Sequence, residues 1–470
     1  YYIMIEKKTL NNYLSLSISL ILIIFFSLCQ INLEDLWFDE LLTFSITNPE
    51  LDNSETYNLL IDQENTPPVY YFLLKTYFEI FNYDYQLLRL PNVFFNSISL
   101  IVFFLILKEF SKDNKFIFLS LILFSLNYFL ISYAHEGRVY SFYCSISLIF
   151  IKFYLSILSE EKPVSLSKSL FFCVLSIILI NTFLFSFLII CTVIFFEFFF
   201  RKNNKNFFLI IFILVFSIIT SILINFDYYE KVLSFQAISI NNPNLDFFLL
   251  NFFFKDFFGS KIMGLIFFIF FVFSLFISFK NNLFNEKLIF LILLIFFSYL
   301  VPILYGYIFQ PVLLDKYIFY VVPIIILFIS FSINNLIHLR KKIVLISFLI
   351  ILTFSNQVLK NKKKEVDKPE FTKILKILNN QYKSNFYATS FMDHKTPFFN
   401  LIVENLIQQI IEKRNFKLIK NKNKKKYWII CYDPSSSFDY CAKDSALFDK
   451  KNIKEIIKTY QVAAILVDKK

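Results

Sequence analysis

Long apolar stretches dominate this chain and limit what it can fold into. A helix needs about 20 apolar residues to cross the roughly 30 Å hydrocarbon core of a bilayer. Eleven stretches approach or reach that length, and each is predicted to be a membrane-spanning helix. The predicted spans are residues 11–29, 88–107, 116–133, 139–158, 169–182, 183–200, 207–225, 260–279, 288–305, 318–337 and 343–358. We therefore expect an all-α polytopic membrane protein with about eleven transmembrane helices.

One of these stretches admits two interpretations. Residues 169–200 form a continuous apolar run, in which Asn181 and Thr182 offer the one plausible turn. We interpret the run as two spans separated by that turn. A single long tilted helix is the alternative, and it would reverse the side of the membrane on which every later loop lies.

Composition excludes several classes of soluble protein. Hydrophobic residues make up 57% of the chain and charged residues 18%, whereas soluble chains have roughly 45–50% and about 25%. Four glycines are too few for the glycine-rich loops that cradle nucleotide phosphates. The net charge of +11 comes from short loops and a lysine-rich tail. We therefore expect membrane lipid, and no nucleic acid, around the protein.

The distribution of basic residues predicts the orientation in the membrane. Lys and Arg are enriched in the cytoplasmic loops of membrane proteins. The loops on one side of the predicted spans carry fifteen of them and the opposite loops seven. The N-terminus is therefore predicted to be cytoplasmic, in a multi-pass protein of the bacterial inner membrane. With eleven spans, the C-terminal tail then lies outside, in a periplasm or an equivalent lumen.

Two domains are expected. Residues 1–358 form the transmembrane domain, in which residues 30–87 are a long first outer loop with juxtamembrane helices. Residues 359–470 alternate between helix-like and strand-like patterns, which predicts a small α/β domain outside the membrane. The helix-like stretches are 397–414 and 450–460, and the strand-like stretches are 385–390, 426–432 and 462–467.

Two cysteines of the tail are close in sequence. Cys431 and Cys441 are ten residues apart, and in an oxidising compartment this spacing permits a hairpin disulfide. Two unrelated thiols are the alternative. The disulfide would stabilise the domain by roughly 2–4 kcal/mol through loop closure.

Two adjacent acids, Asp39 and Glu40, lie near the start of the first outer loop. On a helix with 3.6 residues per turn, neighbouring side chains point about 100° apart. The two carboxylates are thus suited to different tasks, one facing a reacting hydroxyl and the other a metal or a partner. The simpler interpretation is two acids solvated at the membrane surface.

Further polar residues recur at the predicted outer ends of the spans. Glu64 precedes Pro67-Pro68 and Tyr70-Tyr71, and Arg89-Leu90-Pro91 begins the second span. A tight turn contains His135, Glu136, Gly137 and Arg138 followed by Tyr140, and Lys316-Tyr317 precede the tenth span. Anchoring in the lipid headgroups is one interpretation of these residues.

The order of these motifs resembles the GT-C glycosyltransferases. The likeness is greatest to the branch of protein O-mannosyltransferases and aminoarabinose transferases. It covers roughly residues 10–340 and is most specific over residues 36–140. The chain differs from the family pattern at two positions. Thr66 stands where many members have His, and Lys316 stands where Arg is usual. Lys lacks the bidentate fork with which Arg binds phosphate.

The resemblance implies roles for individual residues. Asp39 would be the base that takes a proton from the acceptor. Cations would stabilise the phosphate of the leaving group. Glu40 and Glu64 would orient those cations, contact the acceptor or hold a divalent metal through oxygen ligands. The cations are Arg138 and Lys316, with Arg89 behind them, and the other substrate-binding candidates are His135, Glu136, Tyr140 and Tyr317. The family leaves open whether a divalent metal, held through Asp39 and Glu64, is the cofactor.

The sequence therefore predicts a glycosyltransferase. The donor implied by the resemblance is a sugar linked to polyprenyl phosphate, and the acceptor is a lipid, a glycan or a protein at the periplasmic face. One in-line displacement would invert the anomeric centre. The alternatives are a lipid or polysaccharide transporter, a flippase, and a polysaccharide polymerase or ligase. A transport path would require charged groups near the membrane midplane, whereas the ionisable residues of this sequence gather at the predicted interface.

Overall fold

The three-dimensional structure is a computed structural model. It describes residues 2–29, 31–32, 34–64, 66–160, 162–234, 253–280, 285–309, 311–336, 339–362, 368–380, 384–391, 397–433 and 453–468.

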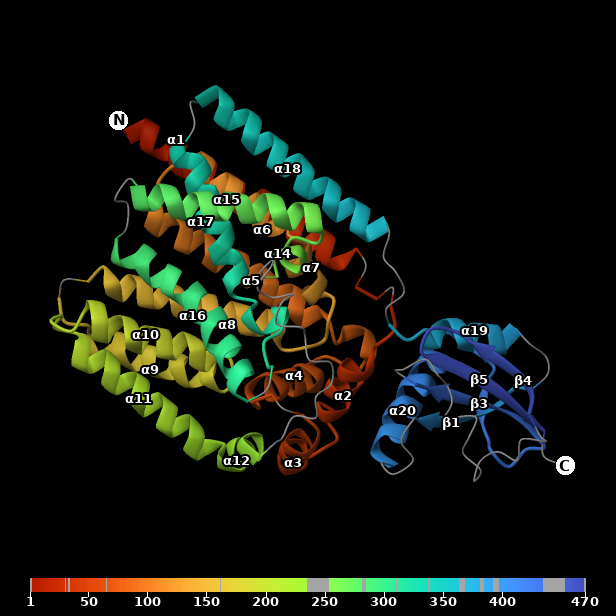
Figure 1. Cartoon of the computed structure of the whole chain (residues 1–470). Coiled ribbons are helices and arrows are strands. Elements are labelled where there is room, and N and C mark those ends of the chain that lie inside the picture. Colours follow the sequence, from red (N-terminus) through yellow and green to blue (C-terminus); the bar gives the residue numbers. More distant parts are fainter. Residues whose placement is uncertain are drawn as a thin grey trace. The chain divides into compact units, whose positions relative to one another are not determined.

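The chain forms two compact units (Figure 1). The membrane unit contains residues 1–29, 57–73 and 90–363, and the loop–tail unit contains residues 30–56, 74–89 and 364–470. The predicted C-terminal domain therefore shares its compact unit with two parts of the first outer loop. Helices α3 (Asn53–Gln63) and α4 (Val69–Ile80) each contribute residues to both units.

The membrane unit is built from helices. Its elements are α1 (Tyr2–Leu28), α5 (Leu90–Phe110), α6 (Asn114–Ser125), α7 (Tyr128–Ala134), α8 (Tyr140–Leu158), α9 (Leu166–Ile180), α10 (Ser186–Phe200), α11 (Phe207–Ile224), α12 (Phe226–Ser234), α14 (Phe254–Phe257), α15 (Lys261–Lys280), α16 (Glu286–Ile308), the 3₁₀ turn η2 (Asp315–Ile318), α17 (Val321–Leu336) and α18 (Leu339–Lys362). Helix α5 packs against α8, α1 against α6, α9 against α11, α10 against α16, and α15 against α17.

Every predicted span corresponds to helix. Among the described residues, seven helices are long and apolar enough to cross a membrane, and a bent pair, α6 with α7, makes an eighth candidate. Three shorter apolar helices, α9, α10 and the first part of α17, account for the remaining predicted spans. The prediction of an all-α polytopic membrane protein is confirmed.

The structure decides the course of the chain in two apolar stretches. The run 169–200 consists of two helices, because α9 ends at Ile180 and α10 begins at Ser186. The predicted span 116–133 is broken between α6 and α7, with a bend of 48°. Asn127 lies in the break, where its side chain accepts a hydrogen bond from the backbone N–H of Leu130 and caps α7.

The surface and the interior of these helices are both suited to lipid. Large apolar side chains such as Phe208, Ile262 and Phe279 are more than two-thirds exposed, which in water would be unfavourable. Buried serines such as Ser120 and Ser298 donate their hydroxyl hydrogens to the backbone carbonyl four residues earlier. The hydroxyl hydrogens of these serines are therefore satisfied and do not face hydrocarbon.

The loop–tail unit combines short helices with a mixed sheet. Its elements are α2 (Phe38–Ile46), the 3₁₀ turn η1 (Tyr85–Leu87), α19 (Phe371–Asn380), β1 (Phe386–Phe391), α20 (Pro397–Lys413), β2 (Ile419–Lys420), β3 (Lys426–Tyr432), β4 (Ile453–Lys458) and β5 (Val462–Asp468). The strand order is β2-β1-β3-β5-β4. Strand β1 is parallel to β2 and β3, and β5 is antiparallel to β3 and β4.

Apolar side chains from the two central strands form the core of this sheet. Tyr427, Ile429 and Cys431 of β3 pack with Ala463 and Ile465 of β5. Helix α19 packs on β5, and α20 packs on β1 and on α2. The first outer loop is thus joined to the tail through α2.

The tail is α/β, as predicted, but one element was assigned wrongly. Residues 450–460 were expected to be helical, whereas Ile453–Lys458 form the edge strand β4. Pairing with β5 decides this, because strand propensity depends on cross-strand neighbours more than on intrinsic preference. The sequence prediction also missed α19, whose buried residues Phe371, Ile374 and Leu378 follow helical spacing.

The cysteine prediction has a direct test. Cys431 is disulfide-bonded, whereas Cys441 lies outside the described residues, so their pairing stays a prediction. We expect mass spectrometry without reduction to recover a cross-linked peptide containing both residues. As an internal control, alkylation after denaturation should label Cys144, which is a free thiol. A native protein with a free thiol at Cys431 or Cys441 would contradict the pairing.

Candidate active site

The two acids at the start of the first outer loop have different surroundings. Both lie in the first turn of α2, where negative charge is favourable at the helix N-terminus. The side chain of Glu40 is fully buried and accepts a 3.4 Å hydrogen bond from the backbone N–H of Trp37. Asp39 is half-buried. The two neighbouring carboxylates therefore have different surroundings, and the separate tasks predicted for them stay predictions.

Arg89 is the main partner of Glu40. Its Nε and Nη2 atoms donate to the two oxygens of Glu40, each at 2.7 Å. Nη1 donates to the carbonyls of Ile31 and Glu34 at 2.7 and 2.9 Å. Nη2 also donates to the carbonyl of Asp35 at 3.2 Å.

These contacts define the surroundings of Arg89, which was predicted to stand behind the phosphate-binding cations. A guanidinium has five N–H donors, and the five contacts above use all of them. Arg89 is also only 2% exposed. In this arrangement it holds the first outer loop in place, and it presents no remaining hydrogen to a donor phosphate.

A second buried ion pair lies in the membrane unit, whereas Glu40 and Arg89 belong to the loop–tail unit. Arg138 donates to Glu64 through Nη1 at 2.5 Å and through Nη2 at 3.3 Å. The two residues are 6% and 7% exposed. Thr66 also donates to Glu64, at 3.3 Å, and Tyr71 lies 3.5 Å from Nη1 of Arg138. Glu64 therefore fixes the orientation of the Arg138 guanidinium.

Two side chains, those of Asn92 and His135, contact backbone carbonyls and so stabilise the turn before Arg138. The side-chain amide of Asn92, near the start of α5, donates to the carbonyls of Glu136 and Arg138. The ring of His135 is buried, and its Nε2 lies 3.2 Å from the carbonyl of Phe26. The predicted substrate-binding role of His135 stays a prediction, and in this structure its ring contacts α1.

Lys316 and Tyr317 lie in the turn η2, and both contact aromatic residues of the membrane unit. Nζ of Lys316 lies 5.1 Å from the ring centre of Tyr140, within the range of a cation–π contact. Tyr317 packs against Phe183 and Phe185, with ring centres 5.3 and 4.9 Å apart. Because Tyr140 follows Arg138 by two residues, the structure brings both predicted phosphate cations to the start of α8.

The carboxyl group beside Lys316 titrates at an unusual pH. Burial raises the pKa of Asp315 to about 6, and the nearby charge of Asp256 adds to the rise. The backbone N–H and the ammonium group of Lys316 oppose it. Asp315 is therefore neutral below about pH 6 and carries a negative charge next to Lys316 above it.

The carboxylates were also candidates for holding a divalent metal. Within the described part of the chain, no group of three or more His, Cys, Asp or Glu side chains converges as a metal site requires. Glu64 already accepts hydrogen bonds from Arg138 and Thr66. A divalent metal held by Asp39 and Glu64 stays a prediction, and the proposed reaction does not require it.

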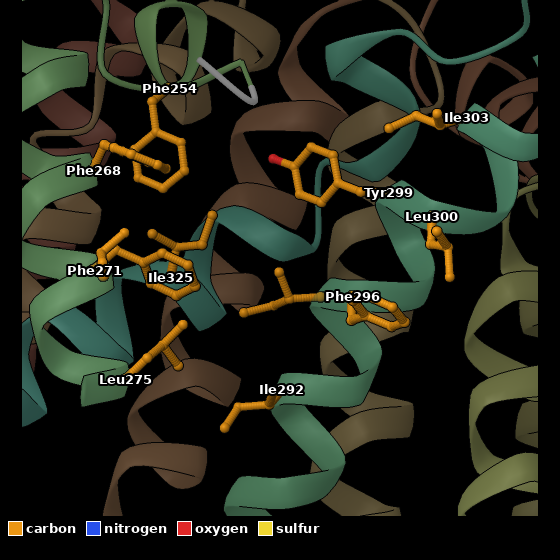
Figure 2. Close-up of a pocket in the computed structure, with 12 residues that line it drawn as sticks. Phe254, Phe268, Phe271, Leu275, Ile292, Phe296, Tyr299, Leu300, Ile303 and Ile325 are labelled. Carbon is orange, nitrogen blue, oxygen red and sulfur yellow. The ribbon is translucent and has the colours of Figure 1, made fainter. Parts of the chain in front are cut away.

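A cavity with an apolar lining lies among the membrane helices (Figure 2). Its volume is about 470 Å³, and α14, α15, α16 and α17 line it. Phe254, Phe268 and Phe271 lie on one side of it, opposite Tyr299 and Phe296, and the phenol of Tyr299 contributes the one side-chain oxygen among the lining residues. Such a lining is suited to hydrocarbon.

Several residues that organise the site escaped prediction. Asn92 follows the Arg89-Leu90-Pro91 motif directly, and this proximity is a signal that could have identified it. Lys368, Thr372 and Tyr432 of the tail also contact the segment around Asp39, as described below. Nothing in the sequence distinguishes them, because the tail is rich in lysine and the contacts join residues more than 300 positions apart.

Comparison with known proteins gives a structural relationship without a sequence relationship. No protein-family model matches the chain, and no curated protein matches it. The crystal structure of ArnT from Cupriavidus metallidurans bound to undecaprenyl phosphate is similar over 97% of both chains, with a TM-score of 0.57 and 9% identity. The same protein in its apo state gives a TM-score of 0.59, again with 9% identity and 97% coverage of both chains. The chain therefore has the GT-C membrane fold of the ArnT structures, completed by a small extramembrane α/β domain.

Proposed function

We propose that this protein is a glycosyltransferase that uses a polyprenyl-phosphate-linked sugar as its donor. The acceptor is a lipid, a glycan or a protein at the periplasmic face of the bacterial inner membrane. The observation that carries the proposal is the fold, because it matches along nearly the whole length of a protein crystallised with undecaprenyl phosphate.

The proposed reaction is a single displacement. The acceptor hydroxyl attacks the anomeric carbon and gives its proton to the carboxylate of Asp39. The bond between that carbon and the phosphate oxygen breaks, and the electron pair stays on the departing polyprenyl phosphate. Arg138 and Lys316 stabilise its negative charge. Attack opposite to the leaving group inverts the anomeric centre.

The buried pair in the membrane unit supports the phosphate-binding part of this proposal. A guanidinium held by a carboxylate keeps its charge and its orientation when no ligand is bound, so little ordering is required when phosphate arrives. Lys316 supplies a second positive charge at the start of α8. The apolar cavity of Figure 2 offers a place for part of a prenyl chain.

The distribution of charge argues against a transporter. Among the described residues of the spans, the ion pairs lie near helix ends. Glu197 pairs with Arg201 at the end of α10, and Glu109 pairs with Lys152 and Lys287 at the end of α5. Transport paths place such groups near the midplane.

The decisive experiment offers the purified protein a panel of polyprenyl-phosphate sugars without an acceptor. Slow donor hydrolysis, measured as released polyprenyl phosphate, is expected for one or a few sugars. Protein inactivated by Asp39→Asn serves as the control for contaminating hydrolases. Movement of the intact donor between leaflets, with no cleavage of any sugar and no transfer, would instead identify a flippase.

The raised pKa of Asp315 predicts how donor binding depends on pH. A sugar-linked polyprenyl phosphate is a phosphodiester, so its charge does not change near pH 6. As the pH falls through about 6, Asp315 becomes neutral and no longer offsets the charge of Lys316. Donor affinity should therefore rise a few-fold, as measured by equilibrium binding to protein in nanodiscs.

The variant Asp315→Asn is the matched control for this prediction. It is permanently neutral, so its donor affinity should be high and independent of pH in this range. His135, the other ionisable candidate considered in this part of the membrane unit, is unchanged in the variant. A pH dependence that persists in Asp315→Asn would contradict the assignment to Asp315.

A further inference from the structure

The loop–tail unit links the catalytic loop to the C-terminal domain through buried polar contacts. Lys368, which precedes α19, places Nζ 3.3 Å from Oε2 of Glu40. Glu40 is fully buried, and the side chain of Lys368 is 10% exposed. The carboxylate adjacent to Asp39 is thus held by Arg89 from the first loop and by Lys368 from the tail.

A second contact fastens the chain just before α2. The two oxygens of Asp35 accept hydrogen bonds from the backbone N–H and the hydroxyl of Thr372, both at 2.6 Å. Thr372 lies in the first turn of α19, where a carboxylate satisfies a backbone donor that has no partner within the helix. Burial raises the pKa of Asp35, which the two bonds to Thr372 partly offset.

A third contact comes from the sheet. Tyr432, at the end of β3, is 1% exposed, and its phenol has a backbone hydrogen bond with Phe38, the first residue of α2. Burial raises the pKa of this phenol, and the neighbouring charge of Asp39 raises it further. Lys368, Thr372 and Tyr432 of the tail therefore contact residues on both sides of Asp39, within the segment 35–40.

We propose that Lys368 and Thr372 are positioning residues that hold α2 so that Asp39 meets the acceptor in the reactive geometry. The C-terminal domain would then be a working part of the active site. This inference rests on the proposed function and adds residues to it that the motifs of the first 340 positions do not contain. A misplacement of about 1 Å at a reacting group can cost roughly 100-fold in rate.

The test compares three substitutions at neighbouring positions in the full-length protein. Lys368→Met removes the charge at similar length, and Lys368→Arg retains it. Lys373→Met is the matched control, because Lys373 lies on α19, five positions after Lys368, is 60% exposed and pairs with Glu370 instead. Donor hydrolysis, donor affinity and hydrogen exchange of the α2 amides are measured for each.

For Lys368→Met we expect kcat to fall roughly 10- to 100-fold, with donor affinity unchanged and faster exchange of the α2 amides. Lys368→Arg should recover most of the activity, and Lys373→Met should match the wild type. If Lys368→Met fails to fold, Thr372→Val replaces it, since it removes one hydroxyl donor and keeps the helix. The same split between kcat and donor affinity is expected for that variant.

The outcomes separate this inference from the function on which it rests. A wild-type protein that cleaves no polyprenyl-phosphate sugar would overturn the proposed function. An active wild type, with Lys368→Met and Thr372→Val at wild-type kcat and unchanged α2 exchange, would overturn the inference alone. Equal loss of kcat in Lys368→Met and Lys373→Met would also overturn it, because exposed and buried lysines would then be equivalent.

Discussion

Replacing Asp39 by Asn should abolish sugar transfer while leaving expression and membrane insertion intact. The amide has nearly the same size and shape, but it cannot accept the proton of the acceptor hydroxyl. A positioned general base contributes typically 10²- to 10⁴-fold to a rate, and we expect kcat to fall by about that factor. Donor affinity should change little. The measurement is single-turnover transfer with purified wild-type and variant protein.

Glu50→Gln is the control for the Asp39 variant. Glu50 is an exposed acid of the same loop, so its neutralisation alters the local charge without touching α2. Turnover of Glu50→Gln should equal that of the wild type. An Asp39→Asn protein with turnover near that of the wild type would remove Asp39 from the mechanism, whatever the effect at Glu50.

Loss of the Arg138 guanidinium should chiefly weaken donor binding. Charged hydrogen bonds are worth about 1.5–3 kcal/mol, which corresponds to a rise in donor Kd of roughly 10- to 100-fold. Arg138→Met alone leaves Glu64 buried and unpaired, at a cost of about 3–5 kcal/mol in stability. The double variant Glu64→Gln/Arg138→Met avoids that cost, because neither residue is then charged.

Donor binding to the double variant is therefore the informative measurement. We expect thermal stability close to that of the wild type and the same weak binding as in Arg138→Met. The matched control is Glu197→Gln/Arg201→Met, which neutralises another buried pair of the membrane unit and should leave donor affinity unchanged. Wild-type affinity in the Glu64/Arg138 double variant would rule out Arg138 as a phosphate ligand.

The ion pairs illustrate how far the motifs predict the site. The sequence picked out Glu40, Glu64, Arg89 and Arg138 as an unusual set of charges beside apolar spans. It did not reveal which carboxylate holds which guanidinium. Arg89, predicted to stand behind the phosphate-binding cations, uses every N–H donor to organise the first loop. Pairing of this kind depends on contacts between residues far apart in sequence.

The elements of the tail also show which features a local sequence pattern can predict. Strand β3 and helix α20 were predicted within a residue or two, because hydrophobic periodicity is a local property. Strand β4 was predicted as a helix, since an edge strand is stabilised chiefly by the neighbour with which it pairs. Likewise, no local sequence pattern indicates that the first loop and residues 364–470 belong to one compact unit.

The sequence by itself determined the medium in which this chain folds, the positions of its apolar helices along the chain and the short list of charged side chains beside them. These properties follow from hydrophobicity and its spacing, which are summed over neighbouring residues. The tertiary structure alone decided the partners: Glu40 with Arg89 and Lys368, Glu64 with Arg138, and Lys316 with Tyr140. Buried charges require partners at hydrogen-bonding distance, and only the folded chain brings those partners within reach.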